Sequence, residues 1–226
     1  MRKHNLVSDN IYHIYNRGVE KRQLFMDEQD YSRFIKCLCL FNDSKPILNA
    51  EYKFKHLDDI AANRNMLVDI LAFCLMPNHF HLLLRQREKN GITKFMRKLC
   101  VGYVNYFNLK HERVGGLFQG RFKSVLIQRD SQFSYIPYYI HLNPLDLIMP
   151  DWRENSISKP MEAVDFLNSF KWSSHLDYLD KPNFPLVSQR ELLNEYFGGS
   201  AGYKKDFNAF IKDLDFTDAD SSLFLE

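Results

Sequence analysis

The chain has 226 residues, 45% of them hydrophobic and 15% aromatic, with a formal net charge of +2, which suits one globular domain with or without an appendage. No segment approaches the roughly 18 uninterrupted apolar residues of a membrane span, and the first residues lack the apolar core of a secretory signal. The four cysteines have no C-x-x-C spacing, so we expect reduced cysteines in a cytoplasmic protein rather than a disulfide framework or a zinc site.

The hydrophobic pattern predicts strands and helices in alternation. In chain order we expect a strand at 10–16, a helix at 28–42, a strand hairpin at 67–75 and 80–85, a helix at 91–110, a strand at 124–128 and a helix ending before Pro144. Three glycines make the stretch 111–120 a loop. This order predicts an α+β fold in which helices pack on a ferredoxin-like antiparallel sheet.

The last third of the chain differs from the rest. Residues 186–213 carry an apolar stripe at helical spacing, and the end at 213–226 is acidic. We predict a main domain at 8–150 and a C-terminal extension at 151–226, which forms a small helical appendage. The pattern leaves open whether the extension packs on the domain, reads nucleic acid or covers a basic surface.

The small net charge hides a strong asymmetry. Residues 85–123 contain ten Lys or Arg and two acids, whereas residues 151–226 hold fourteen acids and eight bases. The aromatic residues interleaved with the basic stretch are Phe95, Tyr103, Tyr106, Phe107, Phe118 and Phe122. Cations along phosphates and rings stacked on unpaired bases suit single-stranded nucleic acid, although a basic helix face over an aromatic core gives the same pattern.

Residues 79–81 read His-Phe-His at the start of an apolar run. In a strand, successive side chains point to opposite faces, so His79 and His81 share one face and Phe80 takes the other. Two imidazoles on one face can hold a metal ion. Histidine pairs also occur at sheet margins without a metal, so this one needs a third ligand from elsewhere.

Residues 138–144 read Tyr-Tyr-Ile-His-Leu-Asn-Pro, in which Tyr139 and Asn143 are four apart and share a helix face. An amide oxygen is a hard metal ligand, and a tyrosine beside a cation is a candidate nucleophile. Pro137 would kink the interior of such a helix. On this segment alone, ordinary packing of the tyrosines is the better explanation.

Taken together, the motifs resemble those of a known family. They are Tyr-His-Ile-Tyr-Asn-Arg-Gly at 12–18, His-Phe-His at 79–81, Gly-Leu-Phe-Gln-Gly-Arg-Phe-Lys-Ser at 116–124, Tyr-Ile-His-Leu-Asn-Pro at 139–144 and Trp-Ser-Ser at 172–174. Their order and spacing resemble the HUH single-strand transposases, in particular the insertion-sequence-200-like and REP-associated tyrosine transposases. The insertion-sequence members usually carry glutamine four residues after the tyrosine, so Asn143 is closer to the REP-associated members.

The resemblance implies that 8–150 is a catalytic domain with a metal site formed by His79, His81 and Asn143. Tyr139 would attack a DNA phosphate and leave a 5′-phosphotyrosine, so that the enzyme nicks and rejoins DNA. Tyr138 and Tyr135 are neighbouring alternatives, although Tyr138 would face away from Asn143. The metal would be Mg²⁺ or Mn²⁺; imidazole ligands favour Mn²⁺, and the choice stays open.

The implied partner is single-stranded or hairpin DNA, and no membrane. Arg17, Arg121 and Lys123 are the cations expected beside the DNA, and a homodimer is compatible with the family. The alternative is a non-catalytic, domesticated protein that binds single-stranded or hairpin DNA. An RNA-processing enzyme on the same fold is a third possibility.

Overall fold

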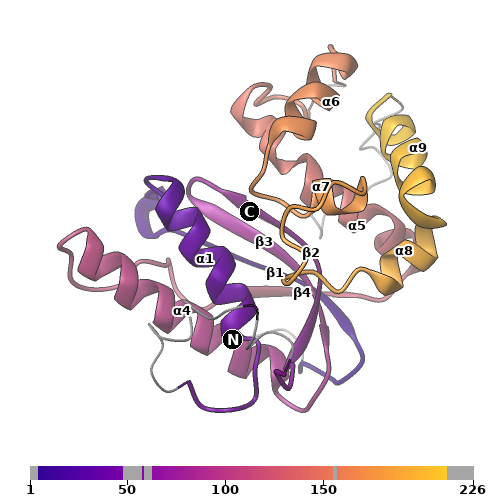
Figure 1. Cartoon of the computed structure of the whole chain (residues 1–226). Coiled ribbons are helices and arrows are strands. Elements are labelled where there is room, and N and C mark those ends of the chain that lie inside the picture. The colour runs from indigo at the N-terminus through magenta and orange to yellow at the C-terminus, as the bar shows by residue number, and fades with distance from the viewer. Residues whose placement is uncertain (1–4, 48–57, 59–62, 155–156, 213–226) are drawn as a thin grey trace.

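The structure is a computed structural model that describes residues 5–47, 58, 63–154 and 157–212 (Figure 1). A four-stranded antiparallel sheet has the order β2-β3-β1-β4. Its strands are β1 (Ile11–Arg17), β2 (Val68–Met76), β3 (His79–Gln86) and β4 (Lys123–Ile127). The helices are α1 (Glu28–Leu40), α4 (Gly91–Lys110), α5 (Asp130–Leu142), α6 (Pro160–Ser169), α7 (His175–Tyr178), α8 (Glu191–Phe197) and α9 (Gly199–Lys212), with 3-10 turns at Val19–Lys21 and Asn143–Leu147. The predicted α+β class and antiparallel sheet are confirmed.

Helices α1 and α4 cover one face of the sheet, while α5 to α9 lie on the other side (Figure 1). The first face includes alternate residues of β3, among them Phe80 and Leu82, which share one core with Phe34 of α1. His79 and His81 therefore point to the opposite face, as the two-residue period of a strand predicts.

The aromatic residues of the basic stretch mostly belong to this core. Phe95, Tyr103 and Phe107 are at most 1% exposed, and the Tyr103 hydroxyl donates to the Leu24 carbonyl at 2.6 Å. These three rings therefore cannot stack on DNA bases, because they are buried between α4 and the sheet. For them the second interpretation, an aromatic core under a helix face, is correct. The spacing of their positions is that of a helix face that packs on a sheet.

Several cations of the same stretch have structural partners. Arg85 and Arg87 both form ion pairs with the buried Asp69 of β2. Lys110, at the end of α4, forms ion pairs with Asp27 and Asp30 before and within α1. Part of the basic stretch therefore stabilises the fold rather than serving to bind a partner molecule.

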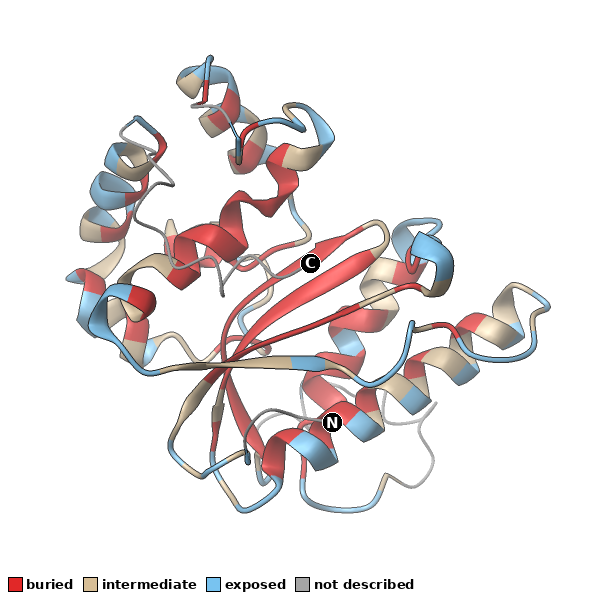
Figure 2. Ribbon diagram, turned by 180° about the vertical axis from the view of Figure 1, so that it is seen from behind, coloured by how far each residue is buried: buried red, intermediate tan, exposed pale blue. Residues whose placement is uncertain are grey.

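The C-terminal extension packs on α5 rather than extending away from the sheet. Most of α5 is buried, as its colour in Figure 2 shows. A second core joins Leu83 of β3 and Tyr138 of α5 to residues of the extension such as Tyr178 and Phe207. The apolar stripe at 186–213 forms α8 and α9 over most of its length, as predicted.

A buried polar network ties α5 to the extension. The Tyr203 hydroxyl of α9 lies 2.7 Å from Nδ1 of both His141 and His175, and His141 Nε2 lies 2.7 Å from Ser174 Oγ. His141 thus points toward the extension and away from His79 and His81. The division of the chain at residue 150 stays a prediction, and the acidic end at 213–226 lies outside the described residues.

The outer edge of β2 is covered by the chain itself. The Leu75 amide donates to the Trp172 carbonyl at 2.9 Å, and the Ser174 amide donates to the Phe73 carbonyl at 3.0 Å. Residues 172–174, which carry the Trp-Ser-Ser motif, therefore satisfy the backbone of an edge strand. The four cysteines are free thiols, as predicted. Among the described residues no helix is long and apolar enough to cross a membrane.

Candidate active site

The histidine pair and Arg17 meet where β1 and β3 run side by side. In the antiparallel register, His81 is opposite Tyr15 and His79 is opposite Arg17. Residues directly opposite each other project to the same face. The rings of His81 and Tyr15 stack with centroids 5.9 Å apart. Arg17, the last residue of β1, thus lies directly opposite His79.

The neighbours of the two histidines fix the orientation of both imidazoles. His81 Nδ1 lies 2.8 Å from His13 Nε2, and His79 Nδ1 lies 2.7 Å from the side-chain oxygen of Asn78. Hydrogen bonds at Nδ1 are typical of histidines that ligate a metal through the other ring nitrogen. They leave Nε2 of each ring as the atom that could ligate a metal.

Burial keeps these imidazoles neutral. It lowers the pKa of His13 to about 3 and the pKa of His79 to about 4, where Arg17 and Arg153 also lower it and Asp146 opposes the shift. The pKa of His81 falls well below its ordinary value because of burial and the neighbouring His79 and His13. Since the neutral ring is the form that binds metals, the pair is ready to ligate at neutral pH.

Helix α5 brings Tyr139 to the histidines. Its ring stands edge-on to the rings of His13 and His81, at 5.9 Å between centroids in each case, and its side chain is 1% exposed. Pro137 lies inside α5, which nevertheless continues to Leu142. The helix therefore continues through the proline, from Asp130 to Leu142.

The two alternative tyrosines occupy different surroundings. Tyr138 faces the extension and packs against Phe197 and Phe210, away from the histidines, as helix geometry predicts. Tyr135 lies one turn before Tyr139 and stacks on it with centroids 6.1 Å apart. Burial, with the neighbouring Tyr139, raises the pKa of the Tyr135 phenol. Tyr139 is thus the tyrosine in contact with the histidine pair.

Asn143 follows the last turn of α5 and completes the predicted set. It is fully buried, and its Nδ2 donates to the Tyr139 carbonyl at 2.7 Å. Its side chain also lies close to His79, where it opposes the lowering of the imidazole pKa by burial. The structure therefore brings His79, His81, Tyr139 and Asn143 together at one end of the sheet.

Two further residues at this site were not predicted from the sequence. His13 precedes Tyr15 and Arg17 by the two-residue period of a strand, which was an available signal. Arg153 donates from Nη2 to Asn143 Oδ1 at 2.9 Å, and its guanidinium carbon lies 5.7 Å from the centroid of the Tyr139 ring. It comes from an irregular segment ten residues after Asn143, where no sequence periodicity indicates it.

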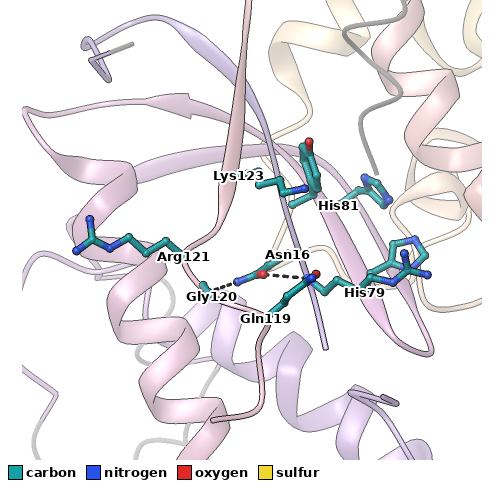
Figure 3. Close-up of a pocket in the computed structure, with 9 residues that line it drawn as sticks. Asn16, His79, His81, Gln119, Gly120, Arg121 and Lys123 are labelled. Atoms are coloured by element: carbon teal, nitrogen blue, oxygen red, sulfur yellow. Dashed lines mark hydrogen bonds between the residues drawn. The ribbon is translucent and has the colours of Figure 1, made fainter. Parts of the chain in front are cut away.

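A cavity of about 350 Å³ opens beside the histidines (Figure 3). Its lining residues are Tyr15, Asn16, Arg17, His79, His81, Gln119, Gly120, Arg121 and Lys123. The cavity thus joins the histidine pair to all three cations expected beside DNA. Figure 3 shows the Arg121 side chain extending away from the histidines, and Lys123 Nζ lies 5.6 Å from the Tyr15 ring centroid.

Asn16 holds the wall of this cavity in place. Its Nδ2 donates to the Gly120 carbonyl at 3.1 Å, while its Oδ1 accepts from the Arg17 amide at 2.9 Å (Figure 3). Gly120 has a φ of 157°, a value that L side chains rarely adopt. The glycine-rich loop is therefore held beside the end of β1, where Gly120 and Arg121 line the cavity.

The donor atoms at this site fit a divalent metal. No three His, Cys, Asp or Glu side chains cluster for a metal within the described part of the chain. The third ligand must then be of another type, and the Asn143 amide oxygen beside His79 meets that need. Two imidazole nitrogens and one oxygen favour a borderline ion such as Mn²⁺ over Mg²⁺, which prefers oxygen.

Comparison with known proteins supports the resemblance that the motifs indicated. No curated protein matches the chain. Among solved structures, the fold is similar to that of a REP-associated tyrosine transposase bound to a REP hairpin, with a TM-score of 0.54 and 10% identity over 83% of this chain and 88% of that chain. The model of a family described as IS200-like transposases matches residues 7–143, more than half of the chain. The chain therefore belongs to the IS200-like transposase family.

Proposed function

We propose that the protein is a metal-dependent transposase and endonuclease that nicks and rejoins single-stranded or hairpin DNA. Tyr139 is the nucleophile, and His79, His81 and Asn143 hold Mg²⁺ or Mn²⁺. The observation that carries the proposal is the meeting of these four side chains, from β3 and α5, beside a cavity lined by three cations. A protein that only binds DNA has no physical need for that set.

The proposed reaction is a transesterification. The Tyr139 hydroxyl oxygen attacks the phosphorus of a DNA phosphodiester and loses its proton, while the bond from phosphorus to the 3′ oxygen breaks and that oxygen gains a proton. The products are a 5′-phosphotyrosine and a free 3′-hydroxyl. Because the phosphodiester bond energy is conserved, the reverse reaction joins strands without ATP.

The chain's own residues orient the reactants. The Nδ1 contacts of His79 and His81 aim their other ring nitrogens, and burial keeps both rings neutral. Arg17, Arg121 and Lys123 hold the phosphates of the strand at the cavity, since phosphate contacts fix register and orientation. The metal, when bound, polarises the phosphate and stabilises the phenolate of Tyr139.

One observation favours the second candidate, a non-catalytic DNA-binding protein. Tyr139 is 1% exposed, so a phosphate can reach its hydroxyl only after neighbouring side chains move. A pure binder would show salt-sensitive binding that a chelator leaves unchanged, and no cleavage.

The test is formation of a covalent adduct with labelled single-stranded and hairpin oligonucleotides, measured on denaturing gels with Mn²⁺, Mg²⁺ or EDTA. We expect an adduct that needs metal and disappears in Tyr139→Phe. Tyr138→Phe is the matched control, because Tyr138 precedes Tyr139 on α5 and packs on the extension. If Tyr139→Phe forms the adduct at the wild-type rate, the nucleophile is wrong. If the wild type binds these oligonucleotides but forms no adduct under any of the three conditions, the second candidate holds.

A further inference from the structure

Arg153 enters the active site from the C-terminal extension. It lies beyond the part of the chain that the family model matches, residues 7–143, and beyond the predicted domain at 8–150. Its guanidinium nevertheless contacts both the predicted third ligand, Asn143, and the ring of the predicted nucleophile, Tyr139. The two contacts make Arg153 a candidate for a role in the proposed reaction.

The position of the guanidinium is tightly defined. Nη1 forms an ion pair with Asp146 Oδ1, and the same oxygen accepts from Trp152 Nε1 at 2.5 Å. The guanidinium carbon lies 4.5 Å from the centroid of the Trp152 ring. Trp152 is itself 2% exposed and belongs to the second core. An arginine held by a carboxylate and a buried ring has little rotamer freedom. A residue that holds a metal ligand in position needs such a fixed side chain.

Arg153 also determines which end of the Asn143 amide faces it. A guanidinium can only donate, so it bonds the amide oxygen and not the nitrogen. The Tyr139 carbonyl can only accept, so it bonds Nδ2 of the same amide. The two partners together exclude the flipped amide. An amide oxygen has two lone pairs, so the bond to Arg153 still leaves one for a metal ion.

The charge of Arg153 is balanced close to the site. A bare guanidinium would repel a divalent cation from His79 and Asn143. Asp146 offsets that charge through its ion pair, and the pKa of His79 is influenced by both groups in opposite directions. A metal ion at the histidines therefore meets a nearly neutral ion pair.

We propose that Arg153 is a positioning residue that orients the Asn143 amide oxygen for metal binding. The proposal rests on the proposed function, because it takes His79, His81 and Asn143 as the ligands. Partners that orient a ligand typically change metal affinity about 10- to 100-fold when they are lost. The family-matched segment then supplies the ligands, and the extension supplies the group that aligns one of them.

The test measures Mn²⁺ binding without DNA, from the electron paramagnetic resonance signal of the free ion. Arg153→Ala should raise the Mn²⁺ dissociation constant about 10- to 100-fold. Arg153→Lys should recover only part of the affinity that Arg153→Ala loses. The ammonium group keeps the positive charge but cannot bond Asn143 and Asp146 in the geometry of the guanidinium. Arg190→Ala is the matched control: Arg190 also donates to an oxygen of the extension, the Asp177 carbonyl, but lies apart from the ligands.

A double-mutant cycle separates positioning from general damage to the fold. If Arg153 acts through Asn143, then Arg153→Ala should have almost no further effect on Mn²⁺ binding in the Asn143→Ala background. An equal loss in both backgrounds, or unchanged or tighter binding in Arg153→Ala alone, would overturn the inference. A wild-type protein that binds no Mn²⁺ would instead refute the metal site of the proposed function.

Discussion

Five buried histidines make the stability of this protein sensitive to mild acid. Burial lowers the pKa of His13 and His175 to about 3 and that of His79 to about 4, and holds the pKa of His81 and His141 well below the ordinary value. These values lie below the unfolded value of about 6.5, so the unfolded chain binds more protons. The stability from the neutral rings is fully present above pH 6.5 and is lost as the pH falls toward the folded values.

The size of the effect follows from linkage. At pH 5.5, one histidine with an unfolded pKa of about 6.5 and a folded pKa near 3 or 4 costs about 1.4 kcal/mol of unfolding free energy. Three such histidines, His13, His79 and His175, cost on the order of 4 kcal/mol, and the lowered pKa values of His81 and His141 act in the same direction. This cost is a large part of the stability of a typical domain, about 5–15 kcal/mol. We therefore expect extensive loss of folded protein between pH 6.5 and 5.

The measurement is urea unfolding followed by circular dichroism from pH 8 to 5.5, with EDTA present so that bound metal does not stabilise the folded state. Carboxylates titrate mainly below about pH 5, so this window isolates the histidines. His175→Gln removes one titrating ring. Below pH 6, the unfolding free energy of this variant should therefore fall with pH less steeply than that of the wild type, the two slopes differing by up to about 1.4 kcal/mol per pH unit. An unfolding free energy that stays constant from pH 7.5 to 5.5 would refute the reasoning.

Three further predictions follow from individual contacts. His13→Leu removes the partner of His81 Nδ1 and should weaken Mn²⁺ binding about 10-fold or more, measured by the same resonance signal; unchanged binding would contradict this role. Lys123→Ala should weaken binding of single-stranded oligonucleotides and make the slope of log K against log salt about 0.7 less steep, in a fluorescence anisotropy titration; an unchanged slope would mean no phosphate contact. Gly91→Ala places a Cβ 2.3 Å from the Leu67 carbonyl and should cost about 1–3 kcal/mol in urea unfolding, whereas the control Gly116→Ala, with its nearest atom at 4.0 Å, should be nearly neutral.

Most of the fold could be predicted from sequence because its signals are local. The strands and helices up to α5 begin and end within a few residues of the predicted ranges. The alternation of side chains along β3 placed His79 and His81 on one face, and the four-residue spacing on α5 placed Tyr139 and Asn143 on another. Each pattern depends on one element only.

The contacts between different helices and strands were harder to predict from the sequence. That His13 meets His81 depends on the register between β1 and β3, which neither strand specifies alone. Arg153 reaches Asn143 through a turn after the 3-10 segment Asn143–Leu147, where no periodic pattern exists to read. Such residues become visible only when the elements are placed in space.

In the basic stretch the pattern was visible in the sequence, but it had two physical interpretations. Phe95, Tyr103 and Phe107 recur at helical spacing with cations between them, as in a groove for unpaired bases. The same spacing describes the buried face of α4. Composition cannot separate the two, because stacking and core packing use the same aromatic side chains.

Residues 172–174 cover the edge of the sheet at β2, and β4 forms the opposite edge in the described part of the chain. A strand donated by a second copy of the chain, or by another protein, would have to add along β4. That strand begins at Lys123, which lines the cavity, so a molecule docked there would lie next to the cavity. Assembly through the sheet and access to the active site would then be coupled by geometry alone.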